Sequence, residues 1–218
     1  MSGEPGMRNV VLYQLLSLDG VAEEPGDWMT DGGRELFENL AAVIGTQDEI
    51  LLGRGTYDYW VDYWPTSAVE PFATFVNTTR KHVFTSTPLT GEWANTVVAD
   101  RPPVEYVRDL KRTDGGDIGI HGSIALAQAL LDADLVDELR LVVAPVVAGT
   151  GRRLFDGSGT GTVRPLELLE SRSTEAGSLL LAYRVARTVD PRRGASRGTR
   201  GSAGGRRPDP DSARAWTS

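Results

Sequence analysis

Residues 9–16, NVVLYQLL, form an almost uninterrupted apolar run near the start of the chain. A strand with one face in water alternates apolar and polar residues, whereas a strand buried on both faces is apolar at nearly every position. We therefore predict a central strand over this run and a sheet that is covered on both faces. This feature constrains the fold most, because doubly covered sheets belong mainly to α/β proteins.

The segments that follow alternate between strand and helix patterns. Further strands are predicted over 49–52, 81–85, 96–99, 117–120 and 137–147, and helices over 31–44, 56–64, 69–76, 103–111 and 124–133. Two strands, 165–171 and 178–185, follow as a hairpin around the turn at 175–177. This order predicts an α/β fold with a mostly parallel central sheet of about eight strands, helices on both faces and a C-terminal antiparallel hairpin.

The composition divides the 218 residues into one domain and two short ends. We expect a flexible N-terminus over 1–7, a single domain over 8–187, and a disordered tail over 188–218, which is rich in Gly, Arg and Ser and poor in aliphatic residues. From residue 190 onward, seven arginines and three aspartates give a net charge of +4, so the rest of a chain of net charge −7 carries −11. Because the chain outside the tail is so acidic, we expect no nucleic-acid partner. An alternative interpretation of the basic tail is a segment that binds RNA or an acidic partner.

Several classes of site are excluded by residue type. The chain has no cysteine and only two histidines, which removes disulfides, thiolate nucleophiles and Cys-based zinc sites and leaves no metal site to predict. No stretch approaches the roughly 18 apolar residues that span a membrane, and no secretory signal is evident. We expect a cytoplasmic protein with no membrane partner.

Small polar residues follow three of the predicted strands. They are Gly-Arg-Gly-Thr at 53–56, Thr-Ser at 85–86 and Gly-Ser at 122–123, the last directly before a helix. Ligands of open α/β sheets bind beyond the carboxyl ends of strands, and helix N-termini attract phosphates. Each segment alone is typical of ordinary capping. Together they predict a dinucleotide site, although neither G-x-G-x-x-G nor the Walker A pattern is present.

Five stretches identify a family: SLDG (17–20), ILLGRGTYDYW (50–60), RKHVFTS (80–86), IHGSIALAQALLDADLVDELRL (120–141) and VVAGTGRRLF (146–155). Through these stretches the chain from about 7 to 186 resembles the dihydrofolate reductase-like fold family. It is most similar to stand-alone proteins related to the reductase domain of the bifunctional riboflavin-biosynthesis deaminase/reductase.

This resemblance implies that the cofactor is NADPH. Family members place the first glycine-rich segment beside the phosphates, the Thr-Ser segment at the adenosine 2′-phosphate, and the last turn with the helix start at the pyrophosphate. The implied cofactor-binding residues are Gly53, Arg54, Thr56, Thr85, Ser86, Gly122, Ser123, Ile124 and Ala125. The chain departs from many relatives in having His121 where they have glycine, so the cis or trans state of the bond that follows is open.

The same resemblance suggests which residues border the substrate. Dihydrofolate reductases use one carboxylate on the first helix, which makes Asp31 and Glu35 the candidate catalytic residues; their alternative interpretations are an N-cap and a solvated charge. Asp19, Trp28 and Tyr57 are candidate substrate contacts, and the alternative for Tyr57 is a place in the core or at a dimer surface.

We expect an NADPH-dependent reductase that transfers hydride to a C=N or C=O group of a small heterocyclic or sugar-derived molecule, and we expect it to form a homodimer. We expect no deaminase half of the bifunctional enzyme in this chain, because the His/Cys zinc signature is missing. The alternatives are a true dihydrofolate reductase and a non-catalytic homodimer that binds ligands with the same fold.

Overall fold

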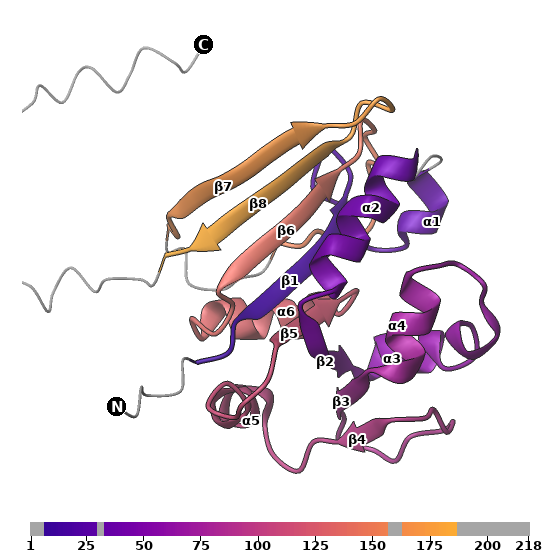
Figure 1. Ribbon diagram of the computed structural model, residues 1–218, viewed down its shortest axis with the longest axis vertical. Coiled ribbons are helices and arrows are strands. Elements are labelled where there is room, and N and C mark those ends of the chain that lie inside the picture. The colour runs from indigo at the N-terminus through magenta and orange to yellow at the C-terminus, as the bar shows by residue number, and fades with distance from the viewer. Residues whose placement is uncertain (1–6, 30–32, 157–162, 187–218) are drawn as a thin grey trace, which may run out of the picture. The chain divides into compact units, whose positions relative to one another are not determined.

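The computed structural model describes residues 7–29, 33–156 and 163–186. An eight-stranded sheet runs through it in the order β4-β3-β2-β5-β1-β6-β8-β7 (Figure 1). The first six strands along the chain are parallel where they pair, and β8 pairs antiparallel with both β6 and β7. The predicted α/β fold with its closing hairpin is confirmed. The strands are β1 (Val10–Leu16), β2 (Gln47–Gly53), β3 (Arg80–Phe84), β4 (Thr96–Val98), β5 (Asp117–His121), β6 (Glu138–Val143), β7 (Leu166–Ser173) and β8 (Leu179–Val185).

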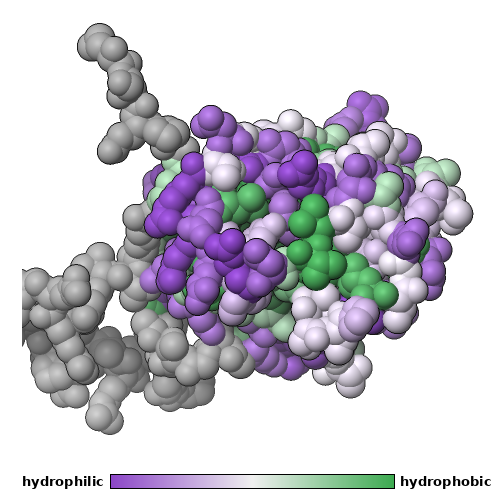
Figure 2. Space-filling model, turned by 90° about the horizontal axis from the view of Figure 1, so that it is seen from below, coloured by the Kyte–Doolittle hydropathy of each residue, from purple (hydrophilic) through white to green (hydrophobic). Residues whose placement is uncertain are grey.

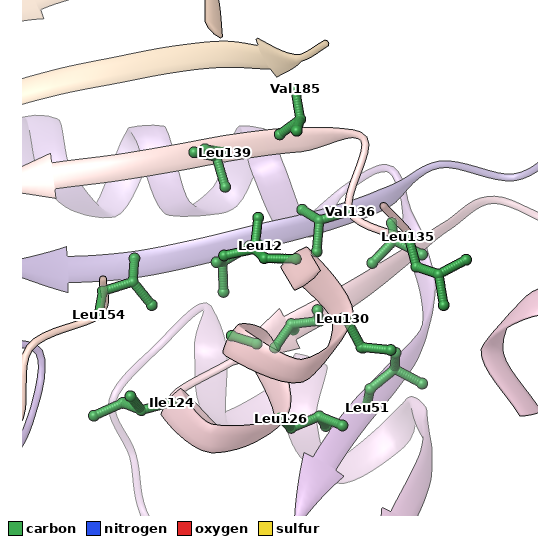
Figure 3. Close-up of a cluster of buried hydrophobic side chains, with 14 of the residues drawn as sticks. Leu12, Leu51, Ile124, Leu126, Leu130, Leu135, Val136, Leu139, Leu154 and Val185 are labelled. Carbon is green, nitrogen blue, oxygen red and sulfur yellow. The ribbon is translucent and has the colours of Figure 1, made fainter. Parts of the chain in front are cut away.

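Helices cover both faces of the sheet, as the apolar run of β1 requires. Along β1, Val10 and Leu12 point into one hydrophobic cluster, and Val11 and Tyr13 point into the other. The first cluster contains side chains of α6, which Figure 3 shows packed against the sheet, together with Val107 of α5. The second cluster contains side chains of α2, α3 and α4. The helices are α1 (Pro25–Trp28), α2 (Gly33–Ile44), α3 (Arg54–Trp60), the 3-10 turn η1 (Trp64–Thr66), α4 (Phe72–Thr78), α5 (Pro103–Leu110) and α6 (Ile124–Asp132).

Some element boundaries differ from the sequence predictions. The strand predicted over 137–147 ends at Val143, because Pro145 has no N–H with which to continue the ladder. The helix predicted over 69–76 begins at Phe72, after Pro71 at its N-cap, and runs to Thr78. The one-turn helix α1 was not predicted, since four residues show no periodicity. The predictions for 1–6 and for the tail from 187 onward lie outside the described residues.

Both edge strands expose apolar side chains. Seen from below, hydrophobic residues lie in separate groups among hydrophilic ones (Figure 2), and at this end of the sheet Val97 and Val98 of β4 are exposed. At the opposite edge every residue of β7 is exposed, including Leu166, Leu168 and Leu169. No helix among the described residues is both long and apolar enough to cross a membrane.

Candidate functional site

The three small polar segments meet at the carboxyl edge of the sheet. Strands β3, β2 and β5 are neighbours and parallel, so their carboxyl ends lie side by side. Residues 85–86 follow β3, residues 53–56 begin at the last residue of β2, and residues 122–125 follow β5. The fold therefore brings together segments that lie up to seventy residues apart in the sequence.

A chain of hydroxyls joins two of these segments. Ser123 Oγ accepts a hydrogen bond from the Gly53 N–H (3.0 Å) and donates to Thr56 Oγ1 (3.0 Å). Thr56 Oγ1 in turn donates to the Gly122 carbonyl (3.2 Å). This corrects the sequence interpretation of both side chains as helix caps: Ser123 stands at the N-cap of α6 without making a capping bond, and the N-cap of α3 is Gly53. The hydroxyls instead fasten the start of α3 to the start of α6.

Gly122 needs to be glycine for two reasons. Its φ of +66° lies in the left-handed region, where a side chain is strained. In addition, a Cβ at this position would lie 3.0 Å from the Trp60 ring. The bond between His121 and Gly122 is trans, since Glu70–Pro71 is the only cis peptide in the described part of the chain.

The first turns of α3 and α6 leave backbone donors open to solvent. The N–H groups in the first turn of a helix have no acceptor within the helix. Gly55, the second residue of α3, is exposed, and a Cβ there would meet nothing within 4 Å. In α6, Ala125 is exposed, whereas the Ile124 side chain is buried in the core and anchors the helix start (Figure 3). Two neighbouring helix starts thus present N–H groups and positive dipole ends, an arrangement suited to an anion.

Arg54 reaches the segment that follows β3. Its Nη1 lies 3.3 Å from Thr85 Oγ1, 2.7 Å from Thr87 Oγ1 and 2.7 Å from the Pro88 carbonyl oxygen. Its Nε donates to Asp58 Oδ2 (2.6 Å) on the next turn of α3. Ser86 is exposed beside these residues. The predicted cofactor residues of the first and second segments are therefore in direct contact.

Asp19 binds the loops of the carboxyl edge to one another. The Ser17 hydroxyl donates to its Oδ1 (2.7 Å), and the N–H groups of Ala148 and Gly149 donate to its two oxygens (2.9 and 3.0 Å). These bonds, that from Ser17 first, hold the pKa of Asp19 well below its usual range. The carboxylate is thus ionised at neutral pH and fastens the turn after β1 to the segment after β6.

The other predicted substrate-side residues occupy separate places. Trp28 donates its Nε1–H to the Glu23 carbonyl (2.9 Å). Glu35, in the first turn of α2, accepts a hydrogen bond from the Glu175 N–H (2.7 Å) in the β7–β8 turn. Asp31 lies outside the described residues, so the catalytic roles of Asp31 and Glu35 stay predictions.

Tyr57 is a core residue, which corrects its assignment as a substrate contact. Its side chain is 1% exposed, its hydroxyl donates to the Gly91 carbonyl (2.9 Å), and its ring lies 6.0 Å from that of Trp93. A side chain so enclosed has no surface to offer a substrate.

His121 is also structural. It packs against Phe72 and Phe75, and its Nε2 lies 2.8 Å from Gln47 Oε1. Burial lowers the pKa of His121 to about 3, so the ring is neutral at pH 7 and its Nε2–H donates to the Gln47 oxygen.

Sequence reasoning missed the partners that surround the predicted site. Asp58, Thr87 and Pro88 hold Arg54, and Trp60 borders Gly122. A signal for Asp58 was present, because an Arg and an Asp four residues apart face each other on a helix. The contacts of Thr87, Pro88 and Trp60 join distant segments and leave no local pattern.

The comparison with protein families decides the family of the chain. The model described as the RibD C-terminal domain matches residues 8–180. The chain belongs to this family. Its members include the reductase half of the bifunctional riboflavin-biosynthesis enzyme, so the resemblance seen in the sequence is confirmed and the fold is that of these reductase domains.

Individual relatives agree with this assignment. The Bacillus subtilis protein YyaP, which is uncharacterized, is 30% identical over 163 residues, covering 71% of this chain and 84% of its own. A pyrimidine reductase-like protein from Corynebacterium diphtheriae superposes with a TM-score of 0.57 at 16% identity, over 83% of this chain and 93% of its own. The deaminase/5-amino-6-(5-phosphoribosylamino)uracil reductase from Thermotoga maritima gives 0.61 at 18% identity, over 83% and 57% respectively. At these identities the solved structures establish the fold.

Proposed function

We propose that this protein is an NADPH-dependent reductase that transfers hydride to a C=N or C=O carbon of a small heterocyclic or sugar-derived substrate. The observation that carries the proposal is the pair of helix starts at the carboxyl edge, joined by the Ser123–Thr56 hydroxyls and open at Gly55 and Ala125. The family adds support, because the Thermotoga relative is named for a reductase that acts on a phosphoribosylamino-uracil.

The residues present fit a dinucleotide phosphate. At Gly55 the backbone is unshielded, and at Ala125 only a methyl group stands at the first turn of α6, so the backbone donors of both helices are accessible to a pyrophosphate. The exposed Ser86 hydroxyl and the Arg54 guanidinium offer donors for the 2′-phosphate, and Thr85, whose hydroxyl donates to the Thr87 carbonyl, shapes the turn that presents Ser86. NADPH would supply the hydride from its nicotinamide C4.

The proton must come from a group other than Asp19. A carboxylate whose pKa lies far below neutrality holds no proton at pH 7, and the oxygens of Asp19 already accept bonds from Ser17, Ala148 and Gly149. Asp31, Glu35 or a water molecule remain as candidates for proton delivery. Asp19 would act by shaping the loops that border the substrate.

A substrate panel tests the proposed activity. Purified protein is mixed with NADPH and, in turn, with phosphoribosylamino-pyrimidines, dihydrofolate and small sugar-derived carbonyl compounds, and the loss of NADPH absorbance is followed. Turnover of a pyrimidine or a carbonyl compound is the expected result. Turnover of dihydrofolate alone would identify a true dihydrofolate reductase, and NADPH binding without any turnover would favour a non-catalytic ligand-binding protein.

We also propose that the protein acts in the cytoplasm as a homodimer. The exposed Leu166, Leu168 and Leu169 on the edge strand β7 support self-association, because apolar side chains beside an unpaired strand edge favour pairing with another chain. Sedimentation equilibrium should give twice the chain mass of 23.6 kDa, and a mass equal to one chain would contradict the dimer.

A further inference from the structure

The guanidinium of Arg54 is held along two of its edges. On one edge Nε donates to Asp58 Oδ2 at 2.6 Å. On the other, Nη1 faces oxygens of the segment 85–88, with Thr87 Oγ1 and the Pro88 carbonyl oxygen both at 2.7 Å. Since a guanidinium is planar and rigid, fixing two edges fixes the whole group.

The segment 85–88 is itself a closed turn. Thr85 Oγ1 donates to the Thr87 carbonyl (2.8 Å) and accepts a hydrogen bond from the Thr87 N–H (3.1 Å). This leaves Ser86 at the exposed tip. The turn is therefore preshaped, and Arg54 fastens it to α3 from outside.

The Arg54–Asp58 pair is poorly placed to serve global stability. The two side chains are 25% and 38% exposed, and ion pairs in contact with water contribute little to folding. Its location is more informative than its strength, because the pair orients the only guanidinium that contacts the 85–88 turn in the described part of the chain.

We propose that Asp58 is a positioning residue that, through Arg54, holds the 85–88 turn in the shape that distinguishes NADPH from NADH. The inference rests on the proposed function, since the turn matters for the 2′-phosphate only if the dinucleotide binds here. Two effects of Asp58 oppose each other. Its negative charge disfavours a nearby phosphate, whereas its hydrogen bond orients the group that receives the phosphate. If positioning dominates, loss of the bond lowers the preference for NADPH even though it removes a negative charge.

Two variants of Asp58 separate these effects. Asp58→Asn removes the charge and keeps an oxygen that accepts the Arg54 Nε–H, whereas Asp58→Ala removes both. The ratio of NADH to NADPH dissociation constants, measured by calorimetry, should fall by about fivefold or more in Asp58→Ala and stay within about twofold of the wild-type ratio, or rise, in Asp58→Asn. Equal ratios in Asp58→Ala and the wild type, or a rise in both variants, would overturn the proposal.

Hydrogen exchange gives a readout that needs no cofactor. The Thr87 N–H should exchange faster in Asp58→Ala than in wild type and nearly normally in Asp58→Asn. Glu38→Ala is the matched control, because it removes a similar Arg–carboxylate pair four residues apart, Arg34–Glu38 at 2.6 Å on α2. It should change neither exchange at Thr87 nor the dissociation-constant ratio.

The proposed function and the positioning role of Asp58 are contradicted by different results. If the wild-type protein binds neither dinucleotide, the proposed function and the role of Asp58 in discrimination are both wrong. Unchanged exchange at Thr87 in Asp58→Ala would show in addition that Asp58 does not hold the 85–88 turn through Arg54. If the wild type prefers NADPH but Asp58→Ala keeps that preference, the proposed function stands and the positioning role is wrong.

Discussion

Replacing Ala125 by glutamate should weaken NADPH binding without weakening the fold. Ala125 is exposed in the first turn of α6, and this first turn contains no acidic residue. A carboxylate there interacts favourably with the helix dipole, by about 0.3–1 kcal/mol, so the melting temperature should be unchanged or slightly higher. A substitution that stabilises the protein while it impairs ligand binding cannot be explained by misfolding.

The loss of affinity follows from charge repulsion. Two unit charges about 5 Å apart in water repel by about 0.8 kcal/mol, so a pyrophosphate with two charges is disfavoured by about 1.5 kcal/mol. This corresponds to roughly a tenfold rise in the dissociation constant. Because the repulsion is between exposed charges, it should shrink as salt is raised from about 0.05 M to about 0.5 M.

Calorimetric titration with NADPH and thermal melting of the same samples measure both effects. Ala129→Glu is the control, since Ala129 is exposed on α6 one turn further from the helix start. It adds the same charge and should change the affinity by less than about threefold. An Ala125→Glu protein that binds NADPH as tightly as wild type would refute the placement of the pyrophosphate at this helix start.

Three further substitutions probe the site and its support. Gly55→Ala should raise the free energy of unfolding by about 0.5–1 kcal/mol, because alanine is the better helix former, and should weaken NADPH binding several-fold by shielding the backbone; denaturant melts and calorimetry check both signs. Ser123→Ala should lower stability by about 1–3 kcal/mol because the Gly53 N–H loses its acceptor, which urea unfolding will measure; an unchanged midpoint would contradict the role given to the hydroxyl. The folded-state pKa of His121, about 3, lies below its unfolded value of about 6.5, so stability is fully present above pH 6.5 and falls as the pH drops toward 3. Between pH 7 and pH 4.5 the wild type should therefore lose about 2–3 kcal/mol more than His121→Gln in urea unfolding, and equal losses would contradict the buried neutral ring.

The fold was predictable where local pattern and burial agree. Val10 to Tyr13 are apolar because alternate residues face two different hydrophobic clusters. This burial on both faces produces an uninterrupted apolar run, which is visible in the sequence alone. The order of the strands is less visible, because β5 lies between β1 and β2 only through contacts made across long stretches of chain.

The candidate site was predictable as a set of segments and much less so as a set of contacts. Ser123 stands at a helix start, where a local rule predicts a cap. Its hydroxyl instead accepts a hydrogen bond from the Gly53 N–H and donates one to Thr56 Oγ1, two groups that are distant in sequence. Tyr57 follows the glycine-rich segment directly, yet helix geometry turns it into the core. Tertiary hydrogen bonding and packing override local preference at both residues.

Whether the protein binds NADPH is measured by calorimetric titration of the 218-residue chain with NADPH and, separately, with NADH. We expect saturable binding of one NADPH per chain, weaker binding of NADH, and loss of NADPH affinity in Ala125→Glu. Absence of NADPH binding at millimolar concentration by a folded protein would contradict this expectation, and equal affinities for the two dinucleotides would contradict the assignment of Arg54, Thr85 and Ser86 to the 2′-phosphate.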